Sequence, residues 1–360
     1  MTGAPTWPPS SPLPLLLTPG DPAGIGAEIA LLARAAWTRA EGEEAVPPFA
    51  LLDDPARLAR LAETRPDLPP IVPIDSPAQT AAAFAEGLPV LEHRFPAPVT
   101  PGHPDPANGG AVIDAIARAV GWVRDGAAAA VVTNPIAKHI VQAAGFAHAG
   151  HTEYLAALAA APEETPPTPV MMLAGPGLRV VPVTVHIPLR EVPEQLRTAA
   201  IAEAGEITAR ALVRDFGIAA PRLAVAGLNP HAGENGTLGR EDIEIVAPAV
   251  ARLRAAGHAV SGPLSADTMF HPAARARYDA ALCMYHDQAL IPLKTLAFDE
   301  GVNITLGLPF VRTSPDHGTA FDLAGTWRAS PRSLIAALAT ARTMAANRQT
   351  AAANAGPDQP

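Results

Sequence analysis

Short apolar runs alternate with longer amphipathic stretches along most of the chain. The runs are continuous rather than alternating, which is typical of strands buried on both faces of a sheet. The stretches between them repeat apolar residues at helical spacing, so the pattern predicts an α/β fold with a largely parallel sheet. We expect strands at Leu15–Thr18, Pro48–Leu52, Ala129–Thr133, Val170–Ala174, Val180–His186, Leu223–Gly227 and Ala280–Met284, and helices at Gly24–Trp37, Gly110–Asp125, Pro193–Phe216, Arg240–Ala256 and Pro331–Ala346.

Prolines gather between these elements, and they predict loops or tails because proline lacks a backbone donor and interrupts helices. The four clusters are Pro5–Pro14, Pro66–Pro77, Pro96–Pro106 and Pro162–Pro169. The chain from Asn347 to Pro360 is small and polar, and we expect a flexible tail there.

Composition narrows the class of protein. The chain has 360 residues, of which 48% are hydrophobic and 17% charged, and this excludes wholesale disorder. A net charge of −9 disfavours nucleic-acid binding, since phosphate backbones would be repelled. One cysteine, Cys283, excludes a disulfide scaffold and suits a reducing cytoplasm. We find no apolar run long enough for a membrane span and no signal peptide, so we expect a cytoplasmic protein that binds no membrane.

Polar residues follow several of the predicted strands directly. In parallel α/β folds, ligands bind at the carboxyl ends of the strands, so these residues are the first candidates for a site. They are Thr18–Asp21, Thr133–Pro135, His186, Leu228–His231 and Tyr285–Gln288. Packing alone does not explain polar groups at five strand ends.

Three histidines, His186, His231 and His286, share this position at the end of an apolar run. Three neutral imidazoles around an open site are suited to a divalent transition metal. The alternative is that each histidine only caps or hydrogen-bonds its own loop. Asp287, beside His286, is a candidate for orienting a ligand or for a catalytic base, or else a helix N-cap.

A second group has the chemistry of a phosphate site. Lys294, Asn303 and Arg312 lie in one C-terminal stretch, and lysine and arginine bind phosphate by charge while asparagine donates a neutral hydrogen bond. Lys138 and Lys294 are the only lysines, so each is a candidate for a role that arginine cannot fill. The alternative is a surface cation without a function.

Three further segments are polar or rich in glycine. Gly20–Glu28 forms a turn between a strand and a helix, where backbone amides favour anions, but it matches neither the Rossmann fingerprint nor a P-loop. Gly150–Tyr154 offers His151 and Thr152 at a predicted helix start, where Thr152 also suits an N-cap. Ser314–Gly325 is a small polar loop that could pack against an adenine.

Together these motifs resemble the 4-hydroxythreonine-4-phosphate dehydrogenase family of vitamin B6 biosynthesis. The resemblance runs from about residue 14 to 345 and rests on these pieces: Thr18–Glu28, Thr133–Lys138, Gly150–Tyr154, Val185–Leu189, Asn229–Glu234, Ala266–Phe270 and most of Tyr278–Gly325. It implies two α/β domains with a central cleft, similar to isocitrate and isopropylmalate dehydrogenases. We expect residues 1–135 plus 300–346 to form the cofactor-side domain and residues 136–299 the metal and dimer side, followed by the tail at 347–360.

The resemblance also implies roles for individual residues. Metal ligands would be His186, His231 and His286, substrate contacts His151, Thr152, Lys294, Asn303 and Arg312, cofactor contacts His317, Gly318, Thr319 and Asp322, and catalytic groups Asp287 and Lys294. The cofactors would be NAD or NADP and one divalent metal (zinc, magnesium, cobalt or manganese), in a homodimer whose active site lies at the subunit interface.

The implied reaction oxidises 4-phosphooxy-L-threonine at its C3 hydroxyl to a β-keto acid, which decarboxylates to 3-amino-2-oxopropyl phosphate. The nearest alternative is a related dehydrogenase acting on phosphothreonate or a cyclic dihydrodiol carboxylate. A phosphate-binding acyltransferase-like protein is a different class, which would need no trio of metal-ligating histidines. A non-catalytic binding or structural protein would not need polar clusters at so many strand ends.

Overall fold

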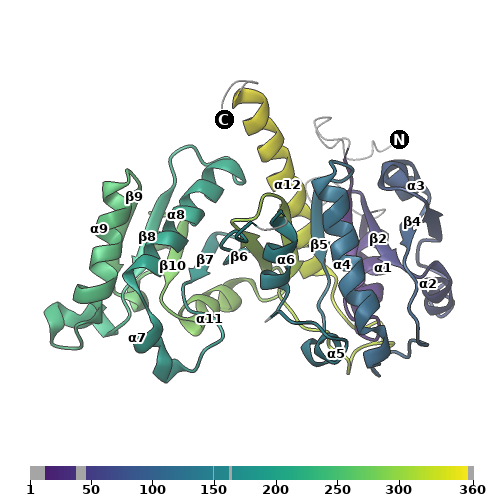
Figure 1. Ribbon diagram of the computed structural model, residues 1–360, viewed down its shortest axis with the longest axis horizontal. Helices are drawn as coiled ribbons and strands as arrows, with labels where there is room; N and C mark the ends of the chain where they lie inside the picture. The colour runs from purple at the N-terminus through teal and green to yellow at the C-terminus, as the bar shows by residue number, and fades with distance from the viewer. Residues whose placement is uncertain (1–12, 38–45, 149, 162–163, 356–360) are drawn as a thin grey trace. The chain divides into compact units, whose positions relative to one another are not determined.

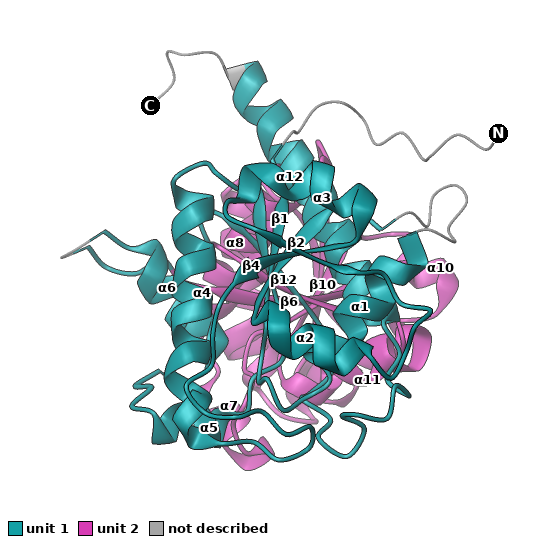
Figure 2. Ribbon diagram, turned by 90° about the vertical axis from the view of Figure 1, so that its right-hand side faces the viewer, with its two compact units in different colours: residues 1–167, 308–360 teal, residues 168–307 magenta. Residues whose placement is uncertain are grey.

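The computed structural model describes residues 13–37, 46–148, 150–161 and 164–355 (Figure 1). The chain divides into two compact units: unit 1 comprises Met1–Pro167 and Leu308–Pro360, and unit 2 comprises Thr168–Gly307 (Figure 2). Each unit has its own strands and its own buried apolar core, so the α/β class is confirmed. Within the described ranges, no helix has both the length and the apolar surface that crossing a bilayer would require.

Unit 1 is built on parallel strands in the order β3-β4-β2-β1-β5-β12. Leu15, Leu16 and Leu17 of the central strand are fully buried, because helices cover the sheet on both sides. Figure 2 shows α4 and α6 on one side and α1 on the other. The elements are β1 (Leu15–Thr18), α1 (Gly26–Trp37), β2 (Phe49–Asp53), α2 (Pro55–Ala62), β3 (Ile71–Ile74), α3 (Thr80–Glu86), β4 (Leu88–Glu92), α4 (Gly109–Arg124), β5 (Ala130–Thr133), α5 (Lys138–Ala143), α6 (His151–Ala159), β12 (Val311–Pro315) and α12 (Arg332–Ala355).

Unit 2 has a mixed sheet in the order β11-β6-β7-β10-β8-β9. β6 runs antiparallel to β7 and to β11, whereas β7, β10, β8 and β9 are parallel. The core under α11 contains Leu173, Val180, Cys283 and Leu293. The elements are β6 (Val170–Gly175), β7 (Leu178–Pro182), α7 (Val192–Gln195), α8 (Thr198–Arg214), β8 (Arg222–Ala226), α9 (Ala247–Ala255), β9 (Ala259–Leu264), α10 (Pro272–Arg275), β10 (Ala280–Cys283), α11 (His286–Ala297) and β11 (Val302–Leu306).

All seven predicted strands form, and their ends shift by a few residues. The largest shift is at β7, which ends at Pro182, so that His186 lies in the following loop rather than in the strand. The predicted helix Pro193–Phe216 is broken into α7 and α8, because Leu196 and Arg197 are extended. The strands β3, β4, β9, β11 and β12 were not predicted, nor were several short helices.

The predicted flexible tail is wrong for residues 347–355, because α12 continues to Ala355. This stretch is rich in alanine, which has the highest helix propensity, and Arg348 donates a hydrogen bond to the Leu308 carbonyl (3.4 Å). The remainder of the predicted tail, residues 356–360, lies outside the described residues, as do most of the first proline cluster and Pro162 of the fourth.

The units also divide the chain at different residues from those expected. Residues 136–167 belong to unit 1, and residues 300–307 belong to unit 2. The physical reason is that α5 and α6 bury Val141 and Leu155 against the core of unit 1. The helices after β5 therefore fold back onto the sheet that precedes them.

Candidate functional site

Three loops of unit 2 carry or lead to the candidate metal ligands. His186 and His231 lie in the loops after β7 and β8, and His286 is the first residue of α11, after the loop that follows β10. Because β7, β10 and β8 are neighbouring parallel strands, all three histidines follow the carboxyl ends of the same sheet. The rings of His186 and His286 lie with their centroids 5.8 Å apart. Within the described ranges, no three His, Cys, Asp or Glu side chains are grouped so as to hold a metal ion. Unit 2 therefore brings two of the imidazoles together but does not complete a ligand set.

Hydrogen bonds tie these three loops to one another. Thr184 donates through its hydroxyl to the Met284 carbonyl (2.7 Å). Gln288 accepts from the Met284 amide (2.6 Å) and donates to the Gly227 carbonyl (2.8 Å). Gln288 was not predicted to have a role, although it stands in the Tyr285–Gln288 motif. It fixes the start of α11 against the loop that leads to His231.

His231 lies in a left-handed turn. Residues 231–235 all have positive φ, from 41° at Glu234 to 79° at Gly233. This conformation costs roughly 1–2 kcal/mol for each residue with a Cβ, so the surroundings must hold it in place. Asp242 does so: its carboxylate is buried and accepts from the amides of Leu228 (2.7 Å) and Asn229 (3.1 Å). Sequence analysis missed Asp242, because its spacing from His231 matches no motif.

Asp287 makes its contact with the neighbouring histidine. Its Oδ1 lies 2.7 Å from His286 Nδ1. This contact favours a proton on Nδ1, which leaves Nε2 as the nitrogen that can bind a metal. Tyr285, not Asp287, occupies the N-cap position of α11, so the capping alternative for Asp287 does not apply.

A cationic cluster forms in unit 1, where Arg312 and His151 meet. Arg312 is buried on β12, and its Nε and Nη2 donate to Thr133 Oγ1 at the end of β5 (3.1 and 2.6 Å). Burial lowers the pKa of Arg312 to about 10, so it stays charged at neutral pH. Burial, together with the charge of Arg312, lowers the pKa of His151 to about 3, so this imidazole is neutral.

The cluster lies at the start of α6. Gly150 occupies its N-cap position, so Thr152 lies within the first turn and is not the cap. His151 Nε2 is buried and neither accepts nor donates a hydrogen bond within the described residues. A fixed positive charge beside a neutral imidazole and a helix start is suited to an anion.

The other two candidate substrate contacts are in unit 2. Lys294 is half-buried on α11, two turns after His286. Asn303 is on β11 and pairs with Leu173 of β6. The five candidates are thus divided, with His151, Thr152 and Arg312 in unit 1 and Lys294 and Asn303 in unit 2.

The candidate cofactor loop of unit 1 packs on the glycine-rich turn before α1. The Thr319 carbonyl accepts from the Ile25 amide (3.1 Å), and a Cβ on Gly24 would lie 2.8 Å from that carbonyl oxygen. A Cβ on Gly318 would meet no atom within 4 Å, so the loop is open at this point. His317 contacts the Gly318 carbonyl through Nδ1 (3.0 Å), and Asp322 is exposed.

The same turn explains Asp21 and Glu28, two acidic residues whose roles the motif alone left open. Glu28 is buried and accepts from the backbone amides of Gly325 and Trp327, which anchors the far end of the cofactor loop. Asp21 accepts from the Ala23 amide (3.0 Å), and burial raises the pKa of both carboxyls. The glycine-rich turn is therefore a scaffold for the loop at 317–327.

Comparison with known proteins gives a consistent result. The family described as "Pyridoxal phosphate biosynthetic protein PdxA" matches residues 47–341. A 4-hydroxythreonine-4-phosphate dehydrogenase of Methylorubrum populi is 57% identical over 334 residues, which cover 92% of this chain and 94% of that protein. The crystal structure of a 4-hydroxythreonine-4-phosphate dehydrogenase from Klebsiella pneumoniae aligns with a TM-score of 0.80 at 38% identity, covering 92% of this chain and 99% of the other.

A terephthalate 1,2-cis-dihydrodiol dehydrogenase from Burkholderia xenovorans has the same architecture. Its crystal structure aligns with a TM-score of 0.60 at 30% identity, covering 92% of this chain and 98% of the other. The architecture therefore also occurs in a dehydrogenase whose named substrate carries no phosphate.

Proposed function

This chain belongs to the PdxA family of pyridoxal phosphate biosynthetic proteins, and on that premise we propose that it is a metal-dependent and NAD(P)-dependent 4-hydroxythreonine-4-phosphate dehydrogenase. It oxidises 4-phosphooxy-L-threonine at its C3 hydroxyl. The observation that carries the proposal is the cluster of buried, charged Arg312 beside neutral His151, because it provides a fixed site for an anionic substrate. Thr152, Lys294 and Asn303 complete the proposed substrate contacts.

In the proposed reaction, a base takes the proton of the C3 hydroxyl and C3 loses a hydride, which a bound nicotinamide cofactor would accept. The resulting β-keto acid loses carbon dioxide, and protonation of the enolate gives 3-amino-2-oxopropyl phosphate. We assign the base role to Asp287, whose carboxylate also keeps His286 in one tautomer. Lys294 balances the negative charge of the phosphate or carboxylate.

His186, His231 and His286 would hold the divalent cation, and two of their rings are already neighbours. When bound, the cation supplies a Lewis acid for the hydroxyl oxygen. Imidazole ligands suit zinc, cobalt and manganese, and an open site admits magnesium. His317, Gly318, Thr319 and Asp322 would contact the cofactor on the loop that Glu28 anchors.

A homodimer would complete the ligand set that one chain leaves incomplete. α11 starts at His286, and its C-terminal half together with its C-cap residue exposes apolar side chains: Ile291 is 62% exposed, Leu296 46% and Phe298 74%. Several large exposed apolar side chains in one segment are a feature that interfaces often cover. We propose that a second copy covers this face, in a cytoplasmic enzyme.

A Phe298→Glu variant should sediment as a monomer and lose bound metal, whereas an unchanged dimer would exclude this face as the interface.

The deciding experiment measures the reduction of NAD and of NADP by the purified protein. The substrates are 4-phosphooxy-L-threonine, phosphothreonate and a cyclic dihydrodiol carboxylate, each with and without a chelator. The proposal predicts chelator-sensitive turnover of 4-phosphooxy-L-threonine. Preference for the dihydrodiol would favour the alternative related to the Burkholderia xenovorans enzyme. Turnover that survives complete metal removal would refute the metal role.

A further inference from the structure

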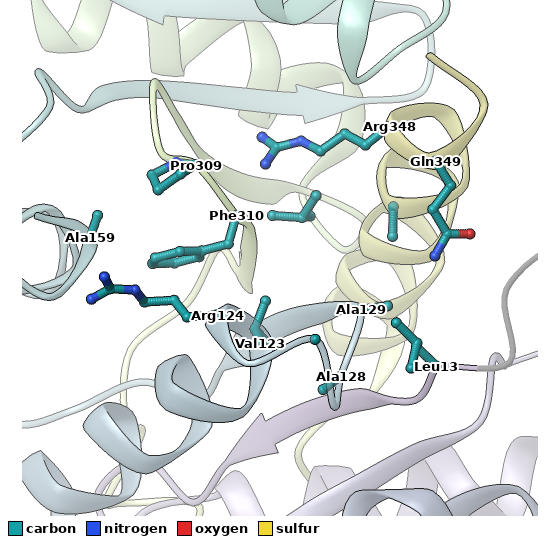
Figure 3. A pocket seen from close by; sticks show the side chains of 13 residues that line it. Leu13, Val123, Arg124, Ala128, Ala129, Ala159, Pro309, Phe310, Arg348 and Gln349 are labelled. Carbon is teal, nitrogen blue, oxygen red and sulfur yellow. The ribbon is translucent and has the colours of Figure 1, made fainter. Parts of the chain in front are cut away.

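Unit 1 has a groove at the amino-terminal ends of three of its strands. Its volume is about 430 Å³, and it is lined by residues that precede three parallel strands: Leu13 before β1, Ala129 before β5 and Phe310 before β12 (Figure 3). None of the candidate substrate and cofactor residues of unit 1 lines the groove, although Arg312 directly follows the lining residue Val311 on β12. The groove is therefore a separate feature, and neither the family nor the proposed reaction assigns it a role.

The lining combines an apolar floor with two cations. Val123, Ala128 and Phe310 supply apolar surface, and Arg124 of α4 and Arg348 of α12 supply positive charge. Figure 3 shows the ring of Phe310 between the two arginine side chains. Among the 13 described residues that line the groove, none is acidic. The groove is thus locally cationic on a protein whose net charge is −9.

We propose that this groove is a second ligand site for a small ring that carries a phosphate or a carboxylate. A volume of about 430 Å³ suits a small molecule of this kind. The two guanidiniums would bind the anionic group, and the apolar floor with Phe310 would bind the ring. A ligand with only an anionic group, or with only a ring, would contact half of the lining, so the proposed ligand carries both.

The groove is connected to the candidate substrate site through two elements. β12 places Val311 in the groove and Arg312 in the anion cluster, so the two sites share adjacent residues. α6 begins with His151 and ends with Ala159, which lines the groove. Arg124 holds this end of α6, since its Nη1 donates to the Leu158 carbonyl (2.7 Å).

A ligand that recruits Arg124 would release the end of α6. The consequence is a looser His151 and weaker binding of the phosphorylated substrate, seen as an increase in KM of about fivefold. This coupling rests on the proposed function, whereas binding in the groove does not. Binding is therefore measured first and separately.

The experiment titrates the full chain by calorimetry with three probes: phenyl phosphate, inorganic phosphate and benzyl alcohol. Phenyl phosphate is expected to bind more tightly than either part alone. The double variant Arg124→Gln with Arg348→Gln should weaken phenyl phosphate binding by at least about tenfold. Arg118→Gln is the matched control, because Arg118 is also on α4 and donates to a backbone carbonyl, that of Glu92, but does not line the groove.

Binding at the candidate substrate site is separated with Arg312→Gln. Phenyl phosphate binding that persists in this variant and is lost in the double variant supports the groove, even where the enzyme proves inactive with every substrate. Equal binding by wild type and double variant, or equal affinity for benzyl alcohol, overturns the proposal. Binding that appears only after residues 1–12 are deleted also overturns it, as does a change of sedimentation in the double variant, which would assign the groove to a second copy.

Discussion

Unit 1 and unit 2 hold their candidate residues in different ways. In unit 1, hydrogen bonds to Thr133 hold the buried Arg312, and the protonation states of Arg312 and His151 follow from burial and, for His151, from the charge of Arg312. In unit 2, His186 and His231 lie in loops after strands, and His286 begins α11. Polar residues behind them fix the backbone, and Asp287 contacts the ring of His286. Unit 1 thus presents a preformed cluster that is suited to an anion, whereas unit 2 presents candidate ligands that, in our proposal, a cation and a second chain would complete.

This difference has an energetic reason. A single fixed cation can be buried because hydrogen bonds to Thr133 offset part of its desolvation. Three imidazoles gain their full binding energy only when a cation joins them, and the described residues bring the rings of His186 and His286 together without completing a set of three. In unit 2, hydrogen bonds instead offset the backbone strain of the left-handed turn that contains His231.

We expect the largest loss of activity when one of the three candidate metal ligands of unit 2 is removed. His231→Ala should lower turnover by roughly a thousandfold or more, because one ligand of the proposed Lewis acid is lost. Thermal stability should stay within a few degrees of wild type, because the side chain lies on a loop. Metal content, measured by mass spectrometry, should fall with turnover. His271→Ala, an exposed histidine of the same unit, is the control; full activity of His231→Ala would rule out the metal role.

The next effect tests the preformed site of unit 1. Arg312→Gln should raise KM for the phosphorylated substrate by about a hundredfold, since it removes a fixed charge-assisted contact. Both kcat and KM are measured, because a purely structural role would lower the amount of active enzyme and leave KM unchanged. Arg118→Gln on α4, which keeps every residue of the cluster, should leave KM as in wild type.

A smaller effect is expected from the support behind His231. Asp242→Asn should cost about 2 kcal/mol of unfolding free energy, because one of the two backbone amides loses its acceptor. It should also weaken metal binding by roughly tenfold, since the turn is less well fixed. Denaturant unfolding and metal titration measure the two effects. Glu244→Gln, which breaks only the exposed pair with Arg240, should change neither quantity.

The smallest effect concerns pH. His151 has a pKa of about 3 when folded and 6.5 when unfolded, so between these values the unfolded chain binds a proton that the folded chain does not. Stability from this group is therefore fully present above pH 6.5 and is lost as pH falls toward 3. His151→Gln should flatten the fall of melting temperature between pH 6.5 and 4. An identical pH profile for the variant would show that His151 is not buried beside Arg312.

The sequence pattern correctly predicted seven strands, because each of them is a continuous apolar run. They missed β3, β4, β9, β11 and β12, because polar residues or prolines interrupt the apolar run in each of them. Prediction of the tail failed for another reason: small residues such as those after Asn347 are common in loops, but alanine also favours helix. The contact between Arg348 and the Leu308 carbonyl joins residues far apart in the sequence, which no local pattern reveals.

The sequence by itself determined which residues are candidates for the chemistry: the histidines after strands, the basic residues of the C-terminal stretch and the polar loop at 317–322. Tertiary structure alone decided how they are held. It brought Arg312 into contact with Thr133 and near His151. It also placed the Asp242 carboxylate where it accepts from the backbone before the turn of His231, and it anchored the candidate cofactor loop on Glu28. Residue type fixes what a side chain can donate or accept, but desolvation and partner choice depend on which distant segments the fold brings into contact.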